Sequence, residues 1–446
     1  FFKKISLNRV QLIQLFISFE KKMLTKDFFI KNRSKILDKL ENKSIALVIA
    51  ADEIPRNGDQ TFTFRQSSDL FYLTGIEQEK TLLIINNCHP DVNKREILFV
   101  RRTSELIETW EGHKHSKDEA KEISGVENVK FFDEMESLLG DLMFYADNIY
   151  LNTNGNVKYN RFYNDADYRF IEKLRYQFPL HTYKRLSPII VKNRLQKSSE
   201  EIEVMKKAIN ITKSAFLRIL KFIKPGVGEY EINAEITHEF IRNKAFTHAY
   251  PPIIASGKDN NILHYTQNNK ICNNGELILM DFGAEYLNYA ADMSRTVPVN
   301  GKFDEFQLKV YNATLKVQKE AFKLMKPGMT INKWNKKVGQ IMENELLELG
   351  LLTTKDIKNQ DSDCPAYKKY YMHGTGHFLG LDVHDIGTTD TPWKAGMILT
   401  NEPGIYIKEK GFGVRLENNI LITENEPIDL MADIPIEADE IMKLMS

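Results

Sequence analysis

Apolar residues along the first part of the chain alternate between a helical and an extended pattern. Residues 27–42 repeat apolar positions with a helical period, whereas short apolar runs at 45–50, 81–85 and 96–100 are bounded by polar or turn residues. The first pattern predicts a helix, and the three runs predict strands. Helices and strands that alternate in this way are typical of an α/β domain.

A well-marked helix start opens the next part of the chain. Ser198 followed by Glu201 is a capping box, in which the two residues satisfy free backbone N–H groups at the helix start. Apolar positions then follow one helical face until Lys224-Pro225-Gly226 ends the helix. A second helix is predicted over residues 229–244.

The same order of elements returns farther along the chain. A predicted helix at 304–325 leads into a second Lys-Pro-Gly at 326–328, 102 residues after the first, and a helix is predicted at 331–349. The repeat indicates a duplicated half-domain, with chance recurrence of a common helix stop as the alternative. We therefore expect an α/β domain over 23–190, followed by a larger α+β domain over 191–446.

Composition narrows the class of protein. A length of 446 residues suggests two or three domains, and 42% hydrophobic with 27% charged residues is ordinary for a globular protein. Lys plus Arg and Asp plus Glu both total 61, which argues against nucleic acid as the main partner. No stretch approaches the roughly 18 apolar residues needed to cross a membrane. Three separated cysteines without CxxC spacing indicate free thiols in a reducing compartment.

The first 22 residues need a separate interpretation. Residues 10–19 are mostly apolar and follow a few basic residues, but Gln11 and Gln14 interrupt the run and no small-residue cleavage site follows. We expect residues 1–22 to be an extension outside the fold, with the natural start at Met23. This interpretation predicts a cytoplasmic protein.

Two aspartates lie in a segment that predicts a β-hairpin. Strand-like runs fill residues 276–301, and a turn near 286–287 would place Asp281 directly opposite Asp292. Facing carboxylates repel unless a cation lies between them, and two metal ions roughly 3.5–4 Å apart match such a pair. The alternative is that both aspartates are solvated turn residues.

Three histidines fall in the glycine-rich segment HGTGHFLGLDVHD at 373–385. The glycines exclude a regular helix, and with it the helix-borne HExxH zinc site. His377 and His384 are seven residues apart, an odd separation that puts them on opposite faces of a regular strand. We therefore expect different functions for them, one as a metal ligand and the other facing the substrate.

Two glutamates complete a candidate ligand set. Glu402 ends an apolar run just before Pro403-Gly404, so a turn orients it, and Glu417 lies inside a predicted strand that reads as buried. A buried carboxylate needs a partner, for which a metal or Arg415 is available. Four carboxylates and one imidazole form an oxygen-rich set that favours Mn²⁺ or a similar ion over a thiolate-type zinc site.

The order of these residues resembles a known family. DFG with a second aspartate after it, HGTGHFLGLDVHD, EPG and RLE resemble the motifs of the methionine aminopeptidase/creatinase superfamily, and within it the aminopeptidase P (Xaa-Pro aminopeptidase) family. RQSSDLFYLTG at 65–75 and ETWEG at 108–112 resemble its N-terminal domain. The resemblance extends from Met23 to about Thr423. It implies a creatinase-type α/β domain followed by a pseudo-symmetric pita-bread metallopeptidase domain.

The resemblance also implies an activity and a set of metal ligands. The activity is hydrolysis of the N-terminal bond in peptides with proline at the second position, with two divalent ions, expected to be Mn²⁺. Asp281 and Glu417 would bridge both ions, Asp292 would bind one ion, and His377 and Glu402 would bind the other. A water between the ions would be the nucleophile, and Glu402 would pass its proton toward the leaving nitrogen.

Other residues acquire roles by the same resemblance. His264, His373 and His384 would line the substrate cleft, with His384 near the scissile carbonyl and His264 near the proline. Arg415 would contact His264 or carboxylates that lie behind the metal ligands. With Glu402, these four residues form the expected catalytic group.

Two aromatic residues, Trp110 and Tyr406, are candidates for substrate contact. The resemblance implies that Trp110 reaches the active site of a neighbouring subunit in a homodimer or homotetramer. The preference for proline also rests on the resemblance alone. The bond before proline is a tertiary amide without an N–H, so it needs a pocket shaped for the ring.

Three alternatives remain. A prolidase, which cleaves Xaa-Pro dipeptides, shares these motifs and differs in its action on tripeptides. Creatinase keeps the fold but needs no metal, and the complete ligand set argues against it. A binding protein with the same fold and no catalysis is the alternative from a different functional class, and metal content would distinguish it.

Overall fold

The computed structural model describes residues 23–153, 165–361 and 363–446. The chain divides into two compact units, the first ending at Asn193 and the second beginning at Arg194. The expectation for residues 1–22 falls outside the described residues. None of the described helices is both long and apolar enough to cross a membrane.

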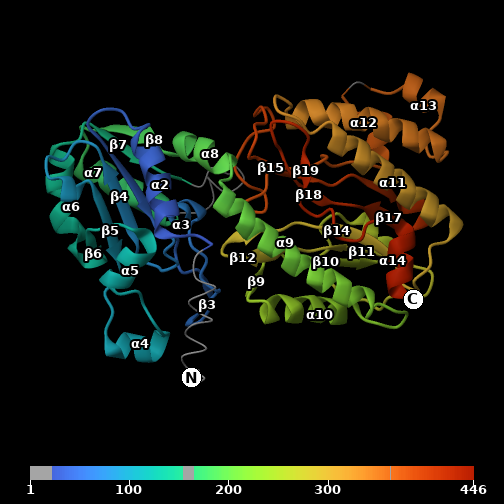
Figure 1. The fold of residues 1–446 in the computed structure, drawn as a ribbon, viewed down its shortest axis with the longest axis horizontal. Helices are drawn as coiled ribbons and strands as arrows, with labels where there is room; N and C mark the ends of the chain where they lie inside the picture. The colour runs from blue at the N-terminus through green and yellow to red at the C-terminus, as the bar shows by residue number, and fades with distance from the viewer. Residues whose placement is uncertain (1–22, 154–164, 362) are drawn as a thin grey trace, which may run out of the picture. The chain divides into compact units, whose positions relative to one another are not determined.

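A mixed sheet of six strands forms the centre of the N-terminal unit, in the order β6-β5-β4-β1-β7-β8 (Figure 1). The middle strand β1 is antiparallel to β4 and parallel to β7. The three strands predicted from apolar runs are confirmed as β1, β4 and β5. The strands are β1 Ser44–Ile49, β4 Leu82–Asn86, β5 Glu96–Val100, β6 Val129–Phe131, β7 Asn148–Leu151 and β8 Thr182–Arg185, and an exposed hairpin pairs β2 Pro55–Asn57 with β3 Gln60–Thr61.

Helices cover both faces of this sheet. Leu82, Ile84 and Phe99 pack on one face against the apolar sides of α6 and α7, while α2 and α3 contact the strands as well. The helix predicted to end at residue 42 ends at Leu37, although Leu40 still packs inward from the turn that follows. The helices are α2 Lys26–Leu37, α3 Ser68–Thr74, α4 Glu105–Glu111, α5 Lys117–Ser124, α6 Met135–Phe144, α7 Ala166–Gln177 and α8 Ser187–Leu195.

Two helix pairs frame the second unit. The predicted capping box is confirmed, since the Ser198 hydroxyl accepts the N–H of Glu201 and the Glu201 carboxylate accepts that of Ser198. The predicted helix–Lys-Pro-Gly–helix order occurs twice, as α9 with α10 and as α11 with α12. Their bounds are α9 Ser199–Leu220, α10 Glu229–Arg242, α11 Glu305–Lys323 and α12 Ile331–Glu348.

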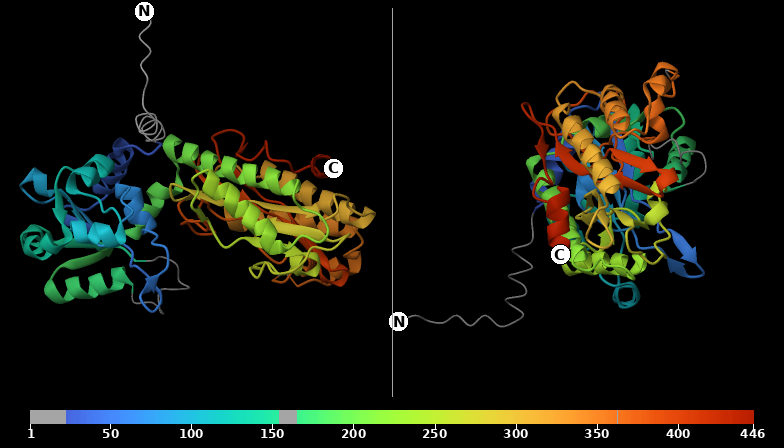
Figure 2. Two further views of the ribbon diagram at one scale, coloured as in Figure 1. Left: turned by 90° about the horizontal axis from the view of Figure 1, so that it is seen from below. Right: turned by 90° about the vertical axis from the view of Figure 1, so that its right-hand side faces the viewer.

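Short antiparallel sheets lie between these helix pairs (Figures 1 and 2). Each half of the unit contributes a three-stranded sheet, β10-β11-β14 and β15-β18-β19, so the duplication extends from the helices to the strands. The strands are β9 Thr247–His248, β10 Ile253–Ser256, β11 Leu277–Asp281, β12 Ala284–Tyr286, β13 Tyr289–Ala290, β14 Ser294–Pro298, β15 Ile398–Asn401, β16 Gly404–Ile407, β17 Phe412–Arg415, β18 Asn418–Leu421 and β19 Ile428–Asp429. Two shorter helices are α13 Thr354–Lys358 and α14 Ala438–Met445.

Candidate metal centre and active site

The two aspartates lie in one hairpin, two residues out of register: Asp281 ends β11, and Asp292 lies in the short segment before β14. β11 and β14 place Asp281 opposite Ser294, and the hairpin beyond them turns at Leu287 and Asn288, both with positive φ. The predicted hairpin is confirmed, but direct opposition of Asp281 and Asp292 is wrong. The turn lies one residue later than expected, which moves the pairing by two. An offset of two keeps both aspartates on the same face.

The histidine-rich segment forms loops rather than a strand. Only Phe378 makes a bridge, to Leu399, among the described residues of 373–385. Consequently the expectation of opposite faces is wrong, because the rings of His377 and His384 lie 4.2 Å apart at an angle of 60°.

The two glutamates flank breaks between strands. Glu402 follows β15 and precedes Pro403, as its turn sequence predicted. Glu417 is buried with 2% exposure, as expected, but it lies between β17 and β18 rather than inside a strand. The chain changes sheet at Leu416 and Glu417, so the carboxylate turns toward the site.

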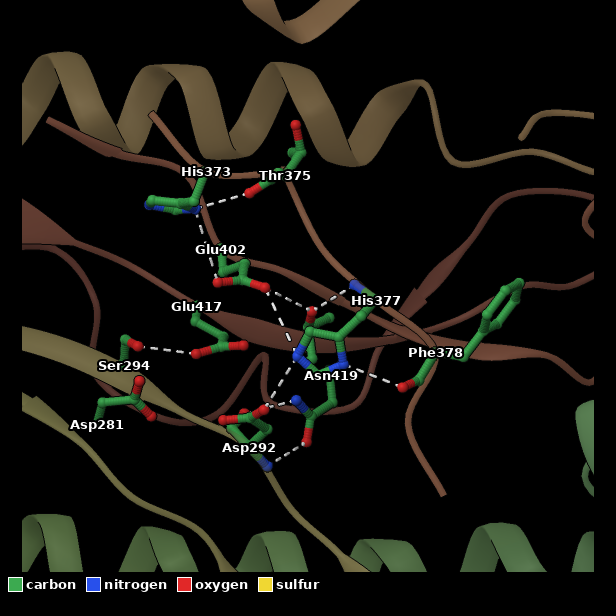
Figure 3. Close-up of polar contacts among 12 residues, drawn as sticks. Asp281, Asp292, Ser294, His373, Thr375, His377, Phe378, Glu402, Glu417 and Asn419 are labelled. Atoms are coloured by element: carbon green, nitrogen blue, oxygen red, sulfur yellow. Dashed lines mark hydrogen bonds and ion pairs between the residues drawn. The ribbon is translucent and has the colours of Figure 1, made fainter. Parts of the chain in front are cut away.

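These side chains converge on one region (Figure 3). His377 Nε2 lies 3.4 Å from Asp292 Oδ2 and 3.6 Å from Glu402 Oε1. Ligand atoms of Asp292, His377 and Glu417 all lie within 4.8 Å of one another. Asp281, at the end of β11, lies beside this group as well, because the Tyr250 hydroxyl contacts both Asp281 and Asp292.

The buried carboxylates of this cluster repel one another, which favours the binding of cations. Burial raises the pKa of Asp292, raises that of Glu402 to about 7 and raises that of Glu417 well above its ordinary value, and neighbouring carboxylates add to each shift. Burial alone would lower the pKa of His377, but the Asp292 hydrogen bond and the Glu402 charge raise it to about 9. Bound cations relieve such repulsion and keep the carboxylates ionised.

The surroundings of Glu417 Oε1 indicate whether this region fits a metal. Glu417 Oε2 accepts a hydrogen bond of 2.8 Å from the Ser294 hydroxyl, whereas Oε1 is buried without any hydrogen-bond partner. A buried carboxylate oxygen without a partner is strongly destabilising. The oxygen-rich donor set and this free oxygen together fit a divalent ion.

Arg415 is the buried cation of the site, with 4% exposure. It donates from Nη2 to Asp281 Oδ2 at 2.6 Å, from Nε to the Ser294 hydroxyl at 2.8 Å and from Nη1 to the Tyr406 hydroxyl at 2.9 Å. These partners differ from the expectation, because the carboxylate that Arg415 contacts belongs to Asp281, itself one of the expected metal ligands. Arg415 thereby fixes the orientation of a carboxylate that would bind metal.

The remaining histidines surround the cluster. His373 lies 2.8 Å from the hydroxyl of buried Tyr406, and burial lowers its pKa to about 3. Burial also lowers the pKa of His384 to about 4, with His377 and His264 as further causes. Both His264 and His384 have exposed side chains. They are thus open to a substrate, whereas His373 is held by Tyr406.

Three supporting residues were missed from the sequence. The Tyr250 hydroxyl lies 2.6 Å from Asp281 and 2.5 Å from Asp292, although it has only one proton to donate. Asn419 holds the backbone of Asp292 from both sides, and Thr400 accepts the N–H of His377.

A signal was present in the sequence for Asn419 and also for Ser294, the donor to Glu417. Ser294 comes two residues after Asp292, and Asn419 comes two after Glu417, a spacing that puts two side chains on the same side of an extended chain. Tyr250 lies in an irregular segment with no such pattern. Trp110 belongs to the other unit, where it lies on α4 with 82% of its surface exposed.

Comparisons with known proteins agree with this site. Residues 203–424 match the model of metallopeptidase family M24, and residues 29–150 match that of the aminopeptidase P N-terminal domain. The Xaa-Pro aminopeptidase of Haemophilus influenzae is 34% identical over 435 residues, covering 95% of this chain and 98% of that protein.

Solved structures lead to the same family. A putative aminopeptidase P from Bacillus anthracis superimposes with a TM-score of 0.88 at 32% identity, covering 95% of this chain and 98% of that one. Zn-substituted E. coli aminopeptidase P in complex with product gives a TM-score of 0.85 at 33% identity, with the same coverage. The chain therefore belongs to the M24 metallopeptidases, with the aminopeptidase P N-terminal domain and the pita-bread catalytic domain of that family.

Proposed function

We propose that this protein is an Xaa-Pro aminopeptidase, which removes the first residue of peptides that have proline at the second position. The observation that carries the proposal is the unpartnered, buried oxygen of Glu417 in a ring of three other carboxylates and His377. Membership of the M24 family and the Xaa-Pro aminopeptidase named in Haemophilus influenzae support the same activity.

Two divalent ions, expected to be Mn²⁺, would be held by Asp281, Asp292, His377, Glu402 and Glu417. The contacts favour a division of ligands different from the one that the resemblance implied. Asp292 touches the Tyr250 hydroxyl beside Asp281 on one side and His377 on the other, so we propose that Asp292, rather than Asp281, lies at the centre of the ligand set. Such ions supply an activated water and polarise the scissile carbonyl.

The protein's own groups would move the proton and hold the peptide. Glu402 would accept the proton from the attacking water, and its carboxylate is oriented for this by the Thr400 hydroxyl, which lies 3.3 Å from Oε1, and by His373, whose Nδ1 lies 3.9 Å from Oε2. His384 would contact the scissile carbonyl and His264 the proline, because both imidazoles are exposed beside the carboxylate cluster.

A chain of hydrogen bonds beneath this site joins Arg415, Tyr406 and His373. Arg415 donates to the Tyr406 hydroxyl, which in turn can donate to His373 Nε2 at 2.8 Å. His373 Nδ1 lies 2.7 Å from the Gly374 carbonyl, so a neutral imidazole satisfies both contacts. Because this chain occupies both ring nitrogens of His373, we propose that His373 and Tyr406 position the site and do not donate a hydrogen bond to the substrate.

The test is a peptide panel after removal of metal. Protein treated with a chelator should be inactive on an Xaa-Pro-Xaa tripeptide and should regain activity with Mn²⁺. An Xaa-Ala-Xaa tripeptide serves as control and should remain uncleaved, because the site would recognise the proline ring. Cleavage of the Xaa-Pro dipeptide alone would establish a prolidase instead. No cleavage with metal bound would favour the non-catalytic alternative.

We also propose a homodimer or homotetramer that acts in the cytoplasm. Cys88, Cys272 and Cys364 are free thiols, which agrees with a reducing compartment. Exposure of Trp110 and of Leu106, also on α4, agrees with a contact to another subunit.

A further inference from the structure

A second group of metal-binding side chains lies in the N-terminal unit. His113, His115 and Glu119 each offer one ligand atom, and these three atoms lie within 4.8 Å of one another. The group occupies the segment between α4 and the first turn of α5. None of these three residues has a role in the peptidase site.

The carboxylate of Glu119 is oriented by its own helix. Its Oε2 accepts the backbone N–H of Ser116 at 2.9 Å and the Ser116 hydroxyl at 3.0 Å, as part of the capping box of α5. Its Oε1 lies 3.1 Å from His113 Nε2. Oε2 thus caps the helix, and since it also lies 3.1 Å from His113 Nε2, both oxygens face the imidazole.

The two histidines lie on the same side of the segment. Their rings are 6.0 Å apart, whereas the intervening Lys114 pairs with Glu79 at 3.0 Å. The backbone N–H of His115 donates to Gln78 at 2.7 Å, which fixes its position. Burial lowers the pKa of His115, which favours the neutral imidazole that binds metals.

We propose that His113, His115 and Glu119 bind one zinc-class divalent ion at the base of α4. Two imidazoles and one carboxylate suit Zn²⁺, Ni²⁺, Co²⁺ or Cu²⁺, with a fourth position left for water. The ion would join the end of α4 to the start of α5. Since α4 has no buried residue and stands away from the sheet of its unit (Figure 1), the ion would restrain this helix and Trp110.

The first test counts bound Zn²⁺ by equilibrium dialysis of the full-length protein. His113→Ala should bind about one ion fewer per chain than the unchanged protein, because a site with three protein ligands loses most of its affinity when one of them is removed. His238→Ala is the matched control, since His238 is an exposed histidine on α10 outside both clusters, and it should bind as many ions as the unchanged protein.

The second test uses Cu²⁺ as a quencher of Trp110 fluorescence. Trp110 and His113 are three residues apart, so their Cα atoms lie within about 11 Å. Cu²⁺ should quench the emission, and the part of the quenching that depends on His113 should vanish in Trp110→Phe. An unchanged Zn²⁺ count and unchanged quenching in both His113→Ala and Glu119→Gln would overturn the proposal. The histidine and the glutamate would then form an ion pair only.

Discussion

Glu417 shows how strongly one residue can depend on a cation. Its carboxylate is 2% exposed, receives one hydrogen bond from Ser294 and keeps Oε1 without a partner. Burial and the neighbouring carboxylates hold its pKa well above the ordinary value in the protein alone. A bound metal would compensate this buried charge, so the residue should stabilise the metal-loaded protein and destabilise the metal-free one.

The variant Glu417→Gln separates these two effects. Its amide oxygen can keep the Ser294 bond while the charge is lost. In chelator-treated protein we expect a higher melting temperature than in the unchanged protein, and in Mn²⁺ the order should reverse because the variant binds metal less tightly. Peptidase activity should fall by at least about 10²-fold. Equal melting temperatures in chelator and in Mn²⁺ for both proteins would show that Glu417 is not a ligand.

His384 should act on the substrate and not on the metal. Its side chain is exposed and its ring packs against His377. His384→Ala should therefore keep the metal content of the unchanged protein and lose about 10²–10³ in kcat/KM, the usual effect of removing one donor to a developing oxyanion. His377→Ala is the comparison and should lose metal as well. If His384→Ala also loses metal, the division of roles between the two histidines is wrong.

At the scale of elements, the sequence predicted features that depend on neighbouring residues, but it did not predict strand pairing or contacts between residues far apart in the chain. The capping box at Ser198 and the turn of the β12–β13 hairpin depend on neighbouring residues, and both were predicted. Strand register was not, because a turn one residue later still satisfies the same apolar pattern and places Ser294 opposite Asp281. The contact of Arg415 with Asp281 joins residues 134 apart, which no local periodicity reveals.

A buried ion cluster anchors the histidine loop to the end of α8 and to the connection between α8 and α9. Asp385 pairs with Arg194 at 2.6 Å and with Lys197 at 2.9 Å, and all three side chains are at most 3% exposed. Burial alone would raise the pKa of Asp385, but the charges of Lys197 and Arg194 outweigh it and lower the pKa. Arg194 and Lys197, which lie far from the metal cluster in sequence, thus fix the loop that carries His384.

Removal of this charge should destabilise the unit. Asp385→Asn leaves buried Lys197 without the Asp385 carboxylate and leaves Arg194 with only the half-exposed Asp382 of the pair, which costs about 3–5 kcal/mol in urea unfolding at pH 7. Because the folded pKa is lowered, the stabilisation is present above the ordinary Asp pKa of about 3.9 and is lost as pH falls below it. The difference between the two proteins should therefore shrink in acid. Asp382→Asn, whose side chain is 44% exposed, should cost less than about 1 kcal/mol.

For the whole molecule, the division of labour between the units was predictable in part. All five proposed metal ligands belong to the second unit, as their positions in the sequence indicated. The N-terminal unit supplies none of them, yet it carries Trp110, which is 82% exposed. A large rigid aromatic surface is suited to covering a bound peptide at low entropic cost. Whether it would cover the site of a neighbouring subunit, as we propose, depends on assembly, which sequence patterns within one chain do not encode.

Mixing two impaired variants tests whether Trp110 serves a neighbouring subunit. Trp110→Ala should keep its metals but bind peptide weakly, and His384→Ala should keep Trp110 but lack catalysis. If Trp110 serves a neighbouring subunit, oligomers reassembled from both variants pair an intact centre with an intact tryptophan, and their activity should exceed the sum of the separate activities. Each variant reassembled with itself is the control. Light scattering should show a dimer or larger, whereas a fully active monomer, or mixed oligomers without any gain, would contradict a role for Trp110 across subunits.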